Sequence, residues 1–338
     1  MAQGPRVAVL GAGSIGCFIG AAWSAAGIPV SFIGRARIAR DIRDHGITAT
    51  DFAGWEHAIA ASDVDFACVP DSLHDADIVA LCVKGGGTGE AARDIARHAR
   101  DGALIVSFQN GVSNFDLLAK LLGNRFQLVR GMVPFNVAYL GDGRFHKGVA
   151  GDLWAEDRGE MRALAEPVAG GPAALALSGN MIGLAWGKLL INLNNAVNAL
   201  SGRTLIDELG ERDYRLVVSA SQREGLKLLR RARIRPAKVG PAPPWLVPAI
   251  LASPDWLFAR LFLKSWKIDA HARSSMADDL ANRRPTEIDY LNGELVRLAA
   301  RLGRSAPVNT RIVELVGRAE AGAAPWQAAA LRTEVLGR

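Results

Sequence analysis

The hydrophobic and polar positions of this chain follow two different patterns. Up to residue 178, short apolar runs such as Val7–Leu10, Ala76–Val83 and Ala103–Ser107 alternate with amphipathic stretches of helical length. Short apolar runs between turn residues predict buried strands, and their alternation with helices predicts a doubly wound, mostly parallel sheet. From residue 179 onward, helical periodicity dominates. We therefore expect an α/β domain at residues 1–178 and an all-α domain at residues 179–338.

The finer pattern predicts individual elements of these domains. Gly46–Val69 contains short alternating segments, and Gly141-Asp142-Gly143 is typical of a hairpin turn. Pro236–Pro248 predicts a loop or lid, because each proline removes a helical hydrogen bond. The other elements that we expect are helices at 14–26 and 88–99 and strands at 30–33, 127–129, 133–140 and 144–149.

Glycines dominate the turn after the first predicted strand. The sequence Gly11-Ala12-Gly13-Ser14-Ile15-Gly16 leads from that strand into a helix of small residues. Gly11 permits a sharp turn, Gly13 lets a pyrophosphate approach the main chain, and Gly16 allows the helix to pack closely on the strand. The phosphates then bind free helix N–H groups. An ordinary glycine-rich turn is the alternative, but the strand–turn–helix context favours a dinucleotide site.

A basic residue stands where a dinucleotide fold contacts the adenosine ribose. Arg35 follows the second predicted strand, and Arg37 lies two residues further on. An acidic side chain here would bind the ribose hydroxyls of NAD, whereas an arginine pairs with the 2′-phosphate of NADP(H). The sequence thus favours NADP(H), with Arg35 as its contact and Arg37 as a helper. A surface arginine on a loop is the alternative.

Two polar residues directly follow buried strands. Lys84 precedes the turn Gly85-Gly86-Gly87, and Asn110 follows the strand at 103–107. Ligands of doubly wound sheets bind at the carboxyl ends of the strands. Both residues are therefore candidates for the ligand site.

Polar residues interrupt an otherwise apolar helix predicted between Trp186 and Leu200. Lys188, Asn192 and Asn195 occupy positions i, i+4 and i+7 on one helix face. Asparagine is a poor helix former, so its density here favours a polar groove that holds a ligand. A hydrogen-bonded seam between helices, with the lysine reaching solvent, is the equal alternative.

A second polar cluster comprises Ser274–Asp279 and the stretch Arg283–Gly293. Thr286 and Asp289 have the spacing of a helix cap, after Pro285 ends the preceding helix. Glu287 has no comparable structural task and is a candidate functional residue. The 6 histidines show neither triad nor metal-ligand spacing, so we assign none of them a role.

Composition and charge narrow the class of partner. The net charge of +6 is spread along the chain, apart from the run Arg230–Arg235. That run is more typical of a solvated helix end, favoured by the helix dipole, than of a polyanion patch. The spread of positive charge favours small anionic ligands over nucleic acid. We expect no membrane-spanning helix, because charges and Pro254 interrupt the apolar stretch Pro248–Trp266.

The cysteines and the start of the chain bear on its compartment. Cys17, Cys68 and Cys82 lie in or beside predicted core elements and lack metal-ligand spacing. This pattern predicts buried, reduced thiols, no metal site and a cytoplasmic protein. No charged and then apolar leader precedes the first strand, so no signal peptide is expected.

These motifs together resemble the ketopantoate reductase (2-dehydropantoate 2-reductase) family of pantothenate biosynthesis. The resemblance rests on Gly11–Gly16, Lys84, Phe108–Gly111, Lys188–Asn192 and Arg284–Asp289, in order over nearly the whole chain. It implies an N-terminal Rossmann domain and a helical C-terminal domain. It also implies an oxidoreductase of the coenzyme A pathway that reduces a 2-keto acid with NADPH.

The resemblance implies roles for single residues. Lys188 matches the family's catalytic lysine, which supplies the proton of the new hydroxyl while hydride arrives from C4 of the nicotinamide. An ammonium suits this task because it donates a proton and stabilises the developing alkoxide. Glu287 matches the glutamate that binds the substrate hydroxyl, and Asn192 the asparagine beside it.

Further matches concern the nicotinamide and the substrate carboxylate. Asn110 and Lys84 match residues near the nicotinamide end of the cofactor. Ser275 matches a serine that meets the carboxylate of the substrate, with Ser274 as the alternative register. Asn195 joins the substrate-binding candidates because it shares the helix face of Lys188.

Two departures from the family pattern lie on the substrate side. The family's second asparagine corresponds to Ala196, while asparagines stand at Asn194, Asn195 and Asn198. The segment 236–271 is also longer than in compact members. The identity of the 2-keto acid therefore stays open, with a reductase of another branched 2-keto acid and a non-catalytic NADP(H)-binding redox sensor as alternatives. A monomer and a homodimer are both compatible with the sequence.

Overall fold

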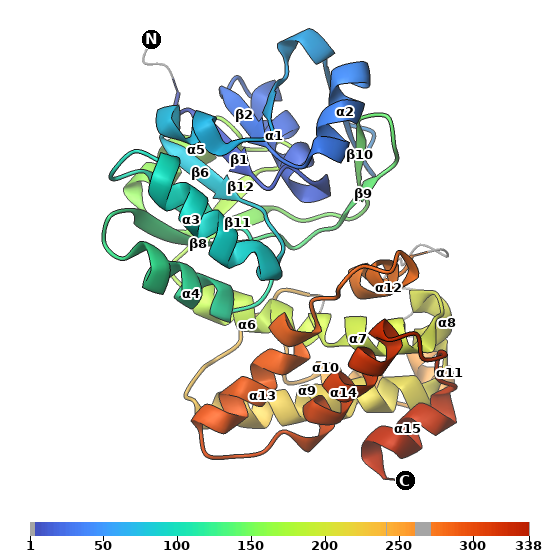
Figure 1. Cartoon of the computed structure of the whole chain (residues 1–338). Coiled ribbons are helices and arrows are strands. Elements are labelled where there is room, and N and C mark those ends of the chain that lie inside the picture. The colour runs from blue at the N-terminus through green and yellow to red at the C-terminus, as the bar shows by residue number, and fades with distance from the viewer. Residues whose placement is uncertain (1–3, 241, 261–271, 338) are drawn as a thin grey trace. The chain divides into compact units, whose positions relative to one another are not determined.

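A computed structural model describes residues 4–240, 242–260 and 272–337 (Figure 1). The chain divides into two compact units, Met1–Met181 and Ile182–Arg338. This division falls a few residues beyond the boundary expected at residue 178. No helix in the described ranges is long and apolar enough to cross a membrane.

The first unit contains an eight-stranded sheet with the order β12-β11-β8-β7-β6-β1-β2-β5. From β5 to β8 all neighbours are parallel, whereas β11 is antiparallel to β8 and parallel to β12. The expectation of a doubly wound, mostly parallel sheet is confirmed. The strands are β1 (Val7–Leu10), β2 (Val30–Ile33), β5 (Asp65–Ala67), β6 (Ile78–Leu81), β7 (Leu104–Ser107), β8 (Gln127–Met132), β11 (Leu153–Glu156) and β12 (Leu175–Ser178).

Helices cover both faces of this sheet. Val7 and Val9 of β1 face the core that contains α1, while Ala8 and Leu10 face the core that contains α3 and α4. Burial on both faces explains why this strand is apolar throughout. The helices are α1 (Ser14–Ala25), α2 (Ala36–His45), α3 (Thr88–His98), α4 (Ser113–Leu122) and α5 (Gly159–Ala165), with 3-10 turns η1 (Ala61–Asp63), η2 (Pro70–Asp75) and η3 (Gly85–Gly87).

A smaller sheet with the order β4-β3-β10-β9 packs against α1. Its strands are β3 (Ile47–Asp51), β4 (Glu56–Ile59), β9 (Val137–Tyr139) and β10 (Arg144–Lys147). The expected hairpin around Gly141–Gly143 is confirmed, because β9 and β10 pair antiparallel. The predicted strand bounds were wrong on either side of Pro134: β8 continues to Met132, and β9 begins only at Val137.

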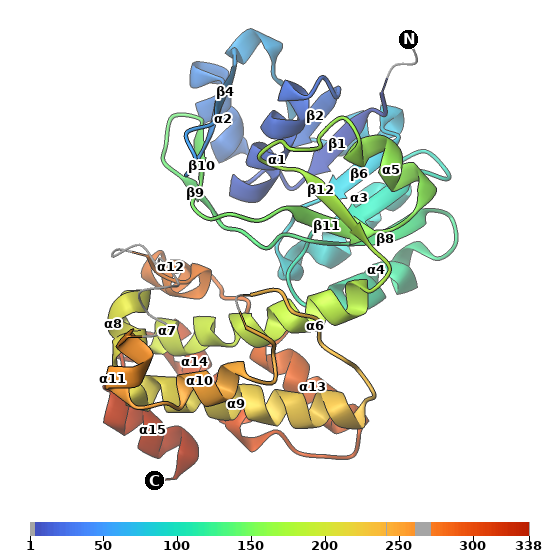
Figure 2. The same cartoon turned by 180° about the vertical axis from the view of Figure 1, so that it is seen from behind.

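The second unit is helical throughout its described part, as expected. Its longest helix, α9, packs against α7, α10 and α15, and Figure 2 shows α10 alongside α9. Tyr214, Val217 and Val218 of α9 are fully buried in the core of the unit. The helices are α6 (Met181–Asn192), α7 (Asn194–Ser201), α8 (Leu205–Gly210), α9 (Arg212–Arg231), α10 (Val247–Leu251), α11 (Asp255–Phe258), α12 (Ser275–Ala281), α13 (Asn292–Arg301), α14 (Pro307–Glu320) and α15 (Ala328–Leu336), with the 3-10 turn η5 (Ile288–Tyr290).

Candidate active site

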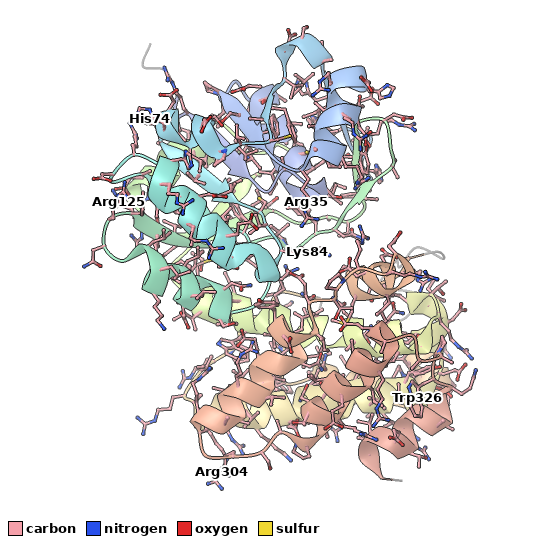
Figure 3. The ribbon with its side chains drawn as sticks, in the orientation of Figure 1. Arg35, His74, Lys84, Arg125, Arg304 and Trp326 are labelled. Carbon is pink, nitrogen blue, oxygen red and sulfur yellow. The ribbon has the colours of Figure 1, made fainter. Side chains whose placement is uncertain are left out.

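The candidate cofactor residues of the first unit lie at one edge of its sheet. The glycine turn, Arg35, Lys84 and Asn110 follow β1, β2, β6 and β7, which are adjacent parallel strands. The register aligns the ends of these strands, because Leu10 pairs with Ile33 and Leu81, and Leu81 with Ser107. Figure 3 shows Arg35 and Lys84 at the same edge of the unit. The topology therefore brings these four features together.

The three glycines of the turn differ in what a side chain would meet. Gly11 has a φ of +96°, and a Cβ there would lie 2.5 Å from the main-chain nitrogen of Val83. A Cβ on Gly16 would lie 2.7 Å from the carbonyl oxygen of Gly11. A Cβ on Gly13, by contrast, would meet nothing within 4 Å. The fold thus requires glycine at positions 11 and 16, whereas position 13 borders open space.

The start of α1 fits a pyrophosphate. Gly13 is the N-cap of α1, and no side chain accepts a hydrogen bond there. The first turn of a helix presents N–H groups that attract anions, and open space beside Gly13 gives an anion access to them. These residues therefore fit the diphosphate of a dinucleotide.

The two candidate arginines after β2 have different surroundings. Arg35 and Arg37 are both exposed, and Arg35 forms the N-cap of α2. The guanidinium carbon of Arg37 lies 5.5 Å from the centre of the Tyr139 ring, a cation–π contact. Because the Arg37 guanidinium lies over the Tyr139 ring, Arg35, immediately after β2, is the stronger candidate for a 2′-phosphate.

A buried polar network, which sequence reasoning missed, connects the loops that carry Lys84 and Asn110. The Gln109 side-chain amide donates to the carbonyl of Val83 at 3.2 Å and to Oγ1 of Thr88 at 2.8 Å. The amide of Asn114 donates to the carbonyl of Asn110 at 2.6 Å. Gln109 lies within the motif Phe108–Gly111, but only the fold shows which loops it joins.

In the second unit, Lys188 and Glu287 interact through their charges. Lys188 lies on α6, and Glu287 is the N-cap of η5. Burial lowers the pKa of Lys188 to about 8, while the negative charge of Glu287 acts in the opposite direction. A lysine with this pKa can exchange a proton near neutral pH. The two residues assigned to catalysis are thus neighbours in the fold.

The predicted single helix between Trp186 and Leu200 is wrong in one respect, because Leu193 divides it into α6 and α7. Lys188 and Asn192 belong to α6, and Asn195 belongs to α7. Near the break, Gln222 Nε2 of α9 donates to the Leu190 carbonyl at 3.0 Å. A side chain of another helix thus binds the main chain of the lysine-bearing helix.

Two of the clustered asparagines have structural partners. Asn194 Nδ2 donates to Glu208 at 3.1 Å, and Asn198 Nδ2 donates to the carbonyl of Arg203 at 3.1 Å. These two amides therefore bind groups of the second unit itself, as the hydrogen-bonded alternative expects, and the ligand groove stays a prediction. Asn192 and Asn195 remain the candidates for the substrate.

The structure distinguishes the two adjacent serines. Ser274 is buried, and its Oγ accepts from the N–H of Ala277 at 3.1 Å and donates to the carbonyl of Asn195 at 3.1 Å. Its own N–H donates to Asn198 Oδ1 at 2.9 Å. Ser275 is exposed. Ser274 thus caps α12 and ties it to α7, which leaves Ser275 as the candidate for the substrate carboxylate.

The cap predicted at Thr286 takes a different form. Thr286 Oγ1 accepts from the N–H of Ile288 at 3.3 Å, and its own N–H donates to Glu320 at 2.8 Å. The turn that follows is a 3-10 turn rather than a helix, and α13 begins only at Asn292. The expectation of a helix start at Thr286 was therefore wrong, although the hydroxyl does bind the main chain locally.

The cysteines and the proline-rich segment only partly follow the sequence prediction. Cys17 is buried, and Cys82 is half-buried, with its pKa raised by burial to about 12. Cys68 is exposed, so the expectation of three buried thiols was wrong for Cys68 and only partly met by Cys82. The described part of 236–248 is a loop, as predicted, until α10 begins at Val247. Residues 261–271 of the longer segment lie outside the described residues.

An α/β dinucleotide-binding unit followed by a helical unit is the architecture of a class of NAD(P)-dependent oxidoreductases. Family comparison refines this class. A model described as "Ketopantoate reductase PanE/ApbA" matches residues 7–159, and one described as "Ketopantoate reductase PanE/ApbA C terminal" matches residues 180–320. The chain belongs to the ketopantoate reductase family.

Curated relatives match over almost their entire length. The 2-dehydropantoate 2-reductase of Archaeoglobus fulgidus is 24% identical, over 94% of this chain and 98% of its own. That of Halobacterium salinarum is 26% identical, over 93% of this chain and 99% of its own. Both comparisons thus extend across the two units.

Solved structures share the fold. A PanE/ApbA family ketopantoate reductase from Ralstonia eutropha has a TM-score of 0.79 at 26% identity and covers 94% of this chain and 98% of its own. D-mandelate dehydrogenase with NADH and anilino(oxo)acetate has a TM-score of 0.77 at 20% identity, with the same coverage. A dimeric ketopantoate reductase from Staphylococcus aureus has a TM-score of 0.70 at 18% identity, over 94% of this chain and 99% of its own.

Proposed function

We propose that this chain reduces 2-dehydropantoate to pantoate with NADPH. The observation that carries the proposal is the charge interaction of Glu287 with Lys188, whose pKa is lowered to about 8, within a chain of this family. The curated relatives from Archaeoglobus fulgidus and Halobacterium salinarum are named 2-dehydropantoate 2-reductases, which supports 2-dehydropantoate as the substrate.

The proposed reaction assigns the proton to Lys188. NADPH, when bound, supplies a hydride to the C2 carbon of the ketone. The ammonium of Lys188 donates a hydrogen bond to the ketone oxygen, stabilises the alkoxide as it forms and transfers one proton to it. One hydride and one proton thus convert the ketone to a secondary alcohol. Glu287 and Asn192 bind the substrate hydroxyl, and Ser275, Asn195 and Asn110 orient the rest of the substrate.

The choice of NADPH over NADH rests on Arg35. An exposed guanidinium at the start of α2 suits bidentate pairing with a 2′-phosphate. We expect Arg35→Ala to raise the KM for NADPH at least tenfold more than the KM for NADH. Arg43→Ala removes another exposed charge from α2 and is the matched control. Equal effects of Arg35→Ala on both cofactors would remove the 2′-phosphate assignment.

A panel of 2-keto acids tests the substrate. With NADPH as the reductant, we expect 2-dehydropantoate to give the highest kcat/KM among branched, hydroxylated and aromatic 2-keto acids. The aromatic members are included because of the structural likeness to D-mandelate dehydrogenase. A higher kcat/KM for another 2-keto acid would retain the reductase but change its substrate.

A redox sensor of the same fold is the remaining alternative. For the enzyme, Lys188→Ala should lower kcat by roughly 10²–10⁴-fold and leave the Kd for NADPH nearly unchanged. A sensor would show no turnover before the substitution. Absence of turnover with every 2-keto acid, together with tight NADPH binding, would favour the sensor.

A further inference from the structure

A hollow of about 700 Å³ opens on the surface of the second unit. The helix α9 contributes Arg223, Lys227 and Arg231, the loop between α13 and α14 contributes Arg304, and α15 contributes Arg332. Figure 3 shows the Arg304 side chain projecting from its loop. None of the residues proposed to bind cofactor or substrate lines this basic hollow.

The positive charges of the basic hollow are largely uncompensated. Among the described residues that line it, Glu224 alone is acidic, and its carboxylate accepts hydrogen bonds from the N–H groups of Val308 and Asn309 at 3.1 and 2.9 Å. Asn309 Nδ2 donates to the same carboxylate at 2.7 Å. This carboxylate is therefore committed to the start of α14 and cannot turn toward a cation without leaving those donors unpaired.

The ion pairs of the second unit also leave most of these positive charges uncompensated. Arg332 pairs with Asp213 at 2.7 Å. The salt bridges formed between described residues include none of Arg223, Lys227, Arg231 and Arg304. Four of the five cations thus lack a salt-bridge partner in the described part of the chain.

The helix dipole does not account for this arrangement. Its favourable effect on cations is confined to the last turn of a helix, which includes Arg231 but neither Arg223 nor Lys227. Like charges four residues apart on a helix repel each other, and Arg223, Lys227 and Arg231 have this spacing. The repulsion among these three side chains destabilises the anion-free protein, and an anion bound among them would offset it.

A second basic hollow continues the first along the same helix. It shares Lys227 with the first hollow and adds Arg230, Arg233 and Arg235 from the basic run noted in the sequence. From Arg223 to Arg231 the helix axis advances about 12 Å. A ligand that engages this row therefore carries more than one negative charge.

We propose that the basic hollow binds a small polyanion with two or more phosphate groups. Guanidinium groups pair with phosphate oxygens bidentately, and the lysine adds a point charge between them. The proposal is independent of the reductase activity, because it uses none of the residues assigned to that reaction.

Calorimetric titration of the full chain with inorganic tripolyphosphate tests the proposal. Two double variants change the hollow, Arg223→Gln with Arg231→Gln and Lys227→Gln with Arg304→Gln. The control, Arg97→Gln with Arg318→Gln, removes the same charge from exposed positions outside it. All variants carry Arg35→Ala as well, so that binding at the proposed 2′-phosphate contact does not mask the result.

We expect each hollow variant to bind tripolyphosphate at least tenfold more weakly than the Arg35→Ala parent, and the control variant to bind like the parent. Both hollow variants should melt no lower than the parent, because they remove like-charge repulsion from an exposed helix face. Equal weakening in the control would show general charge attraction only and would overturn the proposal. So would unchanged binding in both hollow variants.

Discussion

At the scale of the residue, the proposed chemistry depends on the protonation of Lys188. Its pKa of about 8 means that the ammonium, the acid of the reaction, is lost as the pH rises through this value. We expect kcat/KM for ketone reduction to be level below pH ~7 and to fall about tenfold per pH unit above pH ~8. Steady-state kinetics at saturating NADPH measure this profile. A rate that stays level to pH ~10 would remove Lys188 as the proton donor.

A second residue-scale prediction concerns the buried Glu208. Burial raises its pKa to about 8, against hydrogen bonds from Asn194 and Asn198 and the positive charge of Arg215. Glu208 Oε1 and Asn194 Oδ1 are both buried without a hydrogen-bond partner, which suits a protonated carboxyl better than a charged one. We therefore expect Glu208 to be protonated and neutral near pH ~7.

The raised pKa of Glu208 determines how the stability of the protein changes with pH. The pKa of Glu208 is higher in the folded state, so its contribution to stability is complete below the unfolded pKa and is lost as the pH rises to about 8. Glu208→Gln mimics the neutral form. We expect its free energy of unfolding, relative to that of the parent, to rise by more than about 1 kcal/mol between pH ~5 and pH ~9. Parallel pH profiles in denaturant titrations would contradict the assignment.

At the scale of the element, two glycines of the β1–α1 turn serve different purposes: we expect Gly13 to be needed for cofactor binding and Gly16 for folding. Gly13→Ala adds a methyl group where nothing in the protein lies within 4 Å. We expect this variant to melt like the parent and to bind NADPH at least tenfold more weakly, because the methyl group occupies the approach of the pyrophosphate. Thermal melting and fluorescence titration measure the two effects. Unchanged NADPH affinity would mean that the cofactor does not bind at this turn.

Gly16→Ala is the matched comparison at the same turn. Its methyl group would lie 2.7 Å from the Gly11 carbonyl oxygen and 2.8 Å from Cγ1 of Val9. We expect destabilisation of about 1–3 kcal/mol, since overpacking forces the helix away from the strand. Melting temperatures that are equal for the two alanine variants would show that the close packing at Gly16 contributes nothing.

The elements that could be predicted from the sequence are those whose signal is local. The apolar strand, the glycine turn and the strand ends before Lys84 and Asn110 are each specified within about ten residues, and the topology then aligns them. The break at Leu193 could not be predicted, because α6 and α7 both have helical patterns and Gln222 comes from another helix. The hydrogen bond that ties Ser274 to α7 likewise depends on Asn198, which lies 76 residues earlier.

At the scale of the whole molecule, the hydrophobic cores follow the two units. Two clusters draw only on residues of the first unit, and the third draws only on residues of the second. We expect residues 1–181, expressed alone, to unfold cooperatively and to bind NADPH within tenfold of the full chain. An unfolded fragment in circular dichroism would show that the first unit needs the second to fold. Loss of NADPH affinity in a folded fragment would place cofactor contacts outside residues 1–181.

The division into units could be predicted from the sequence, because strand patterns give way to helical periodicity near residue 179. The basic run Arg230–Arg235 illustrates the limit of that approach. Its neighbour in the first hollow, Arg304, comes from a distant part of the chain, and only the fold brings the two together. The charge pattern of one helix thus underestimates how much positive charge gathers on the surface to which that helix contributes.

We propose that this chain transfers hydride from the nicotinamide to C2 of 2-dehydropantoate. The direct measurement is mass spectrometry of the product formed by the purified chain from 2-dehydropantoate and NADPH deuterated at the transferred C4 position. We expect pantoate that carries one deuterium at C2, formed in step with NADPH oxidation. Oxidation without deuterated pantoate, or no oxidation of NADPH in the presence of this substrate, would contradict the proposal.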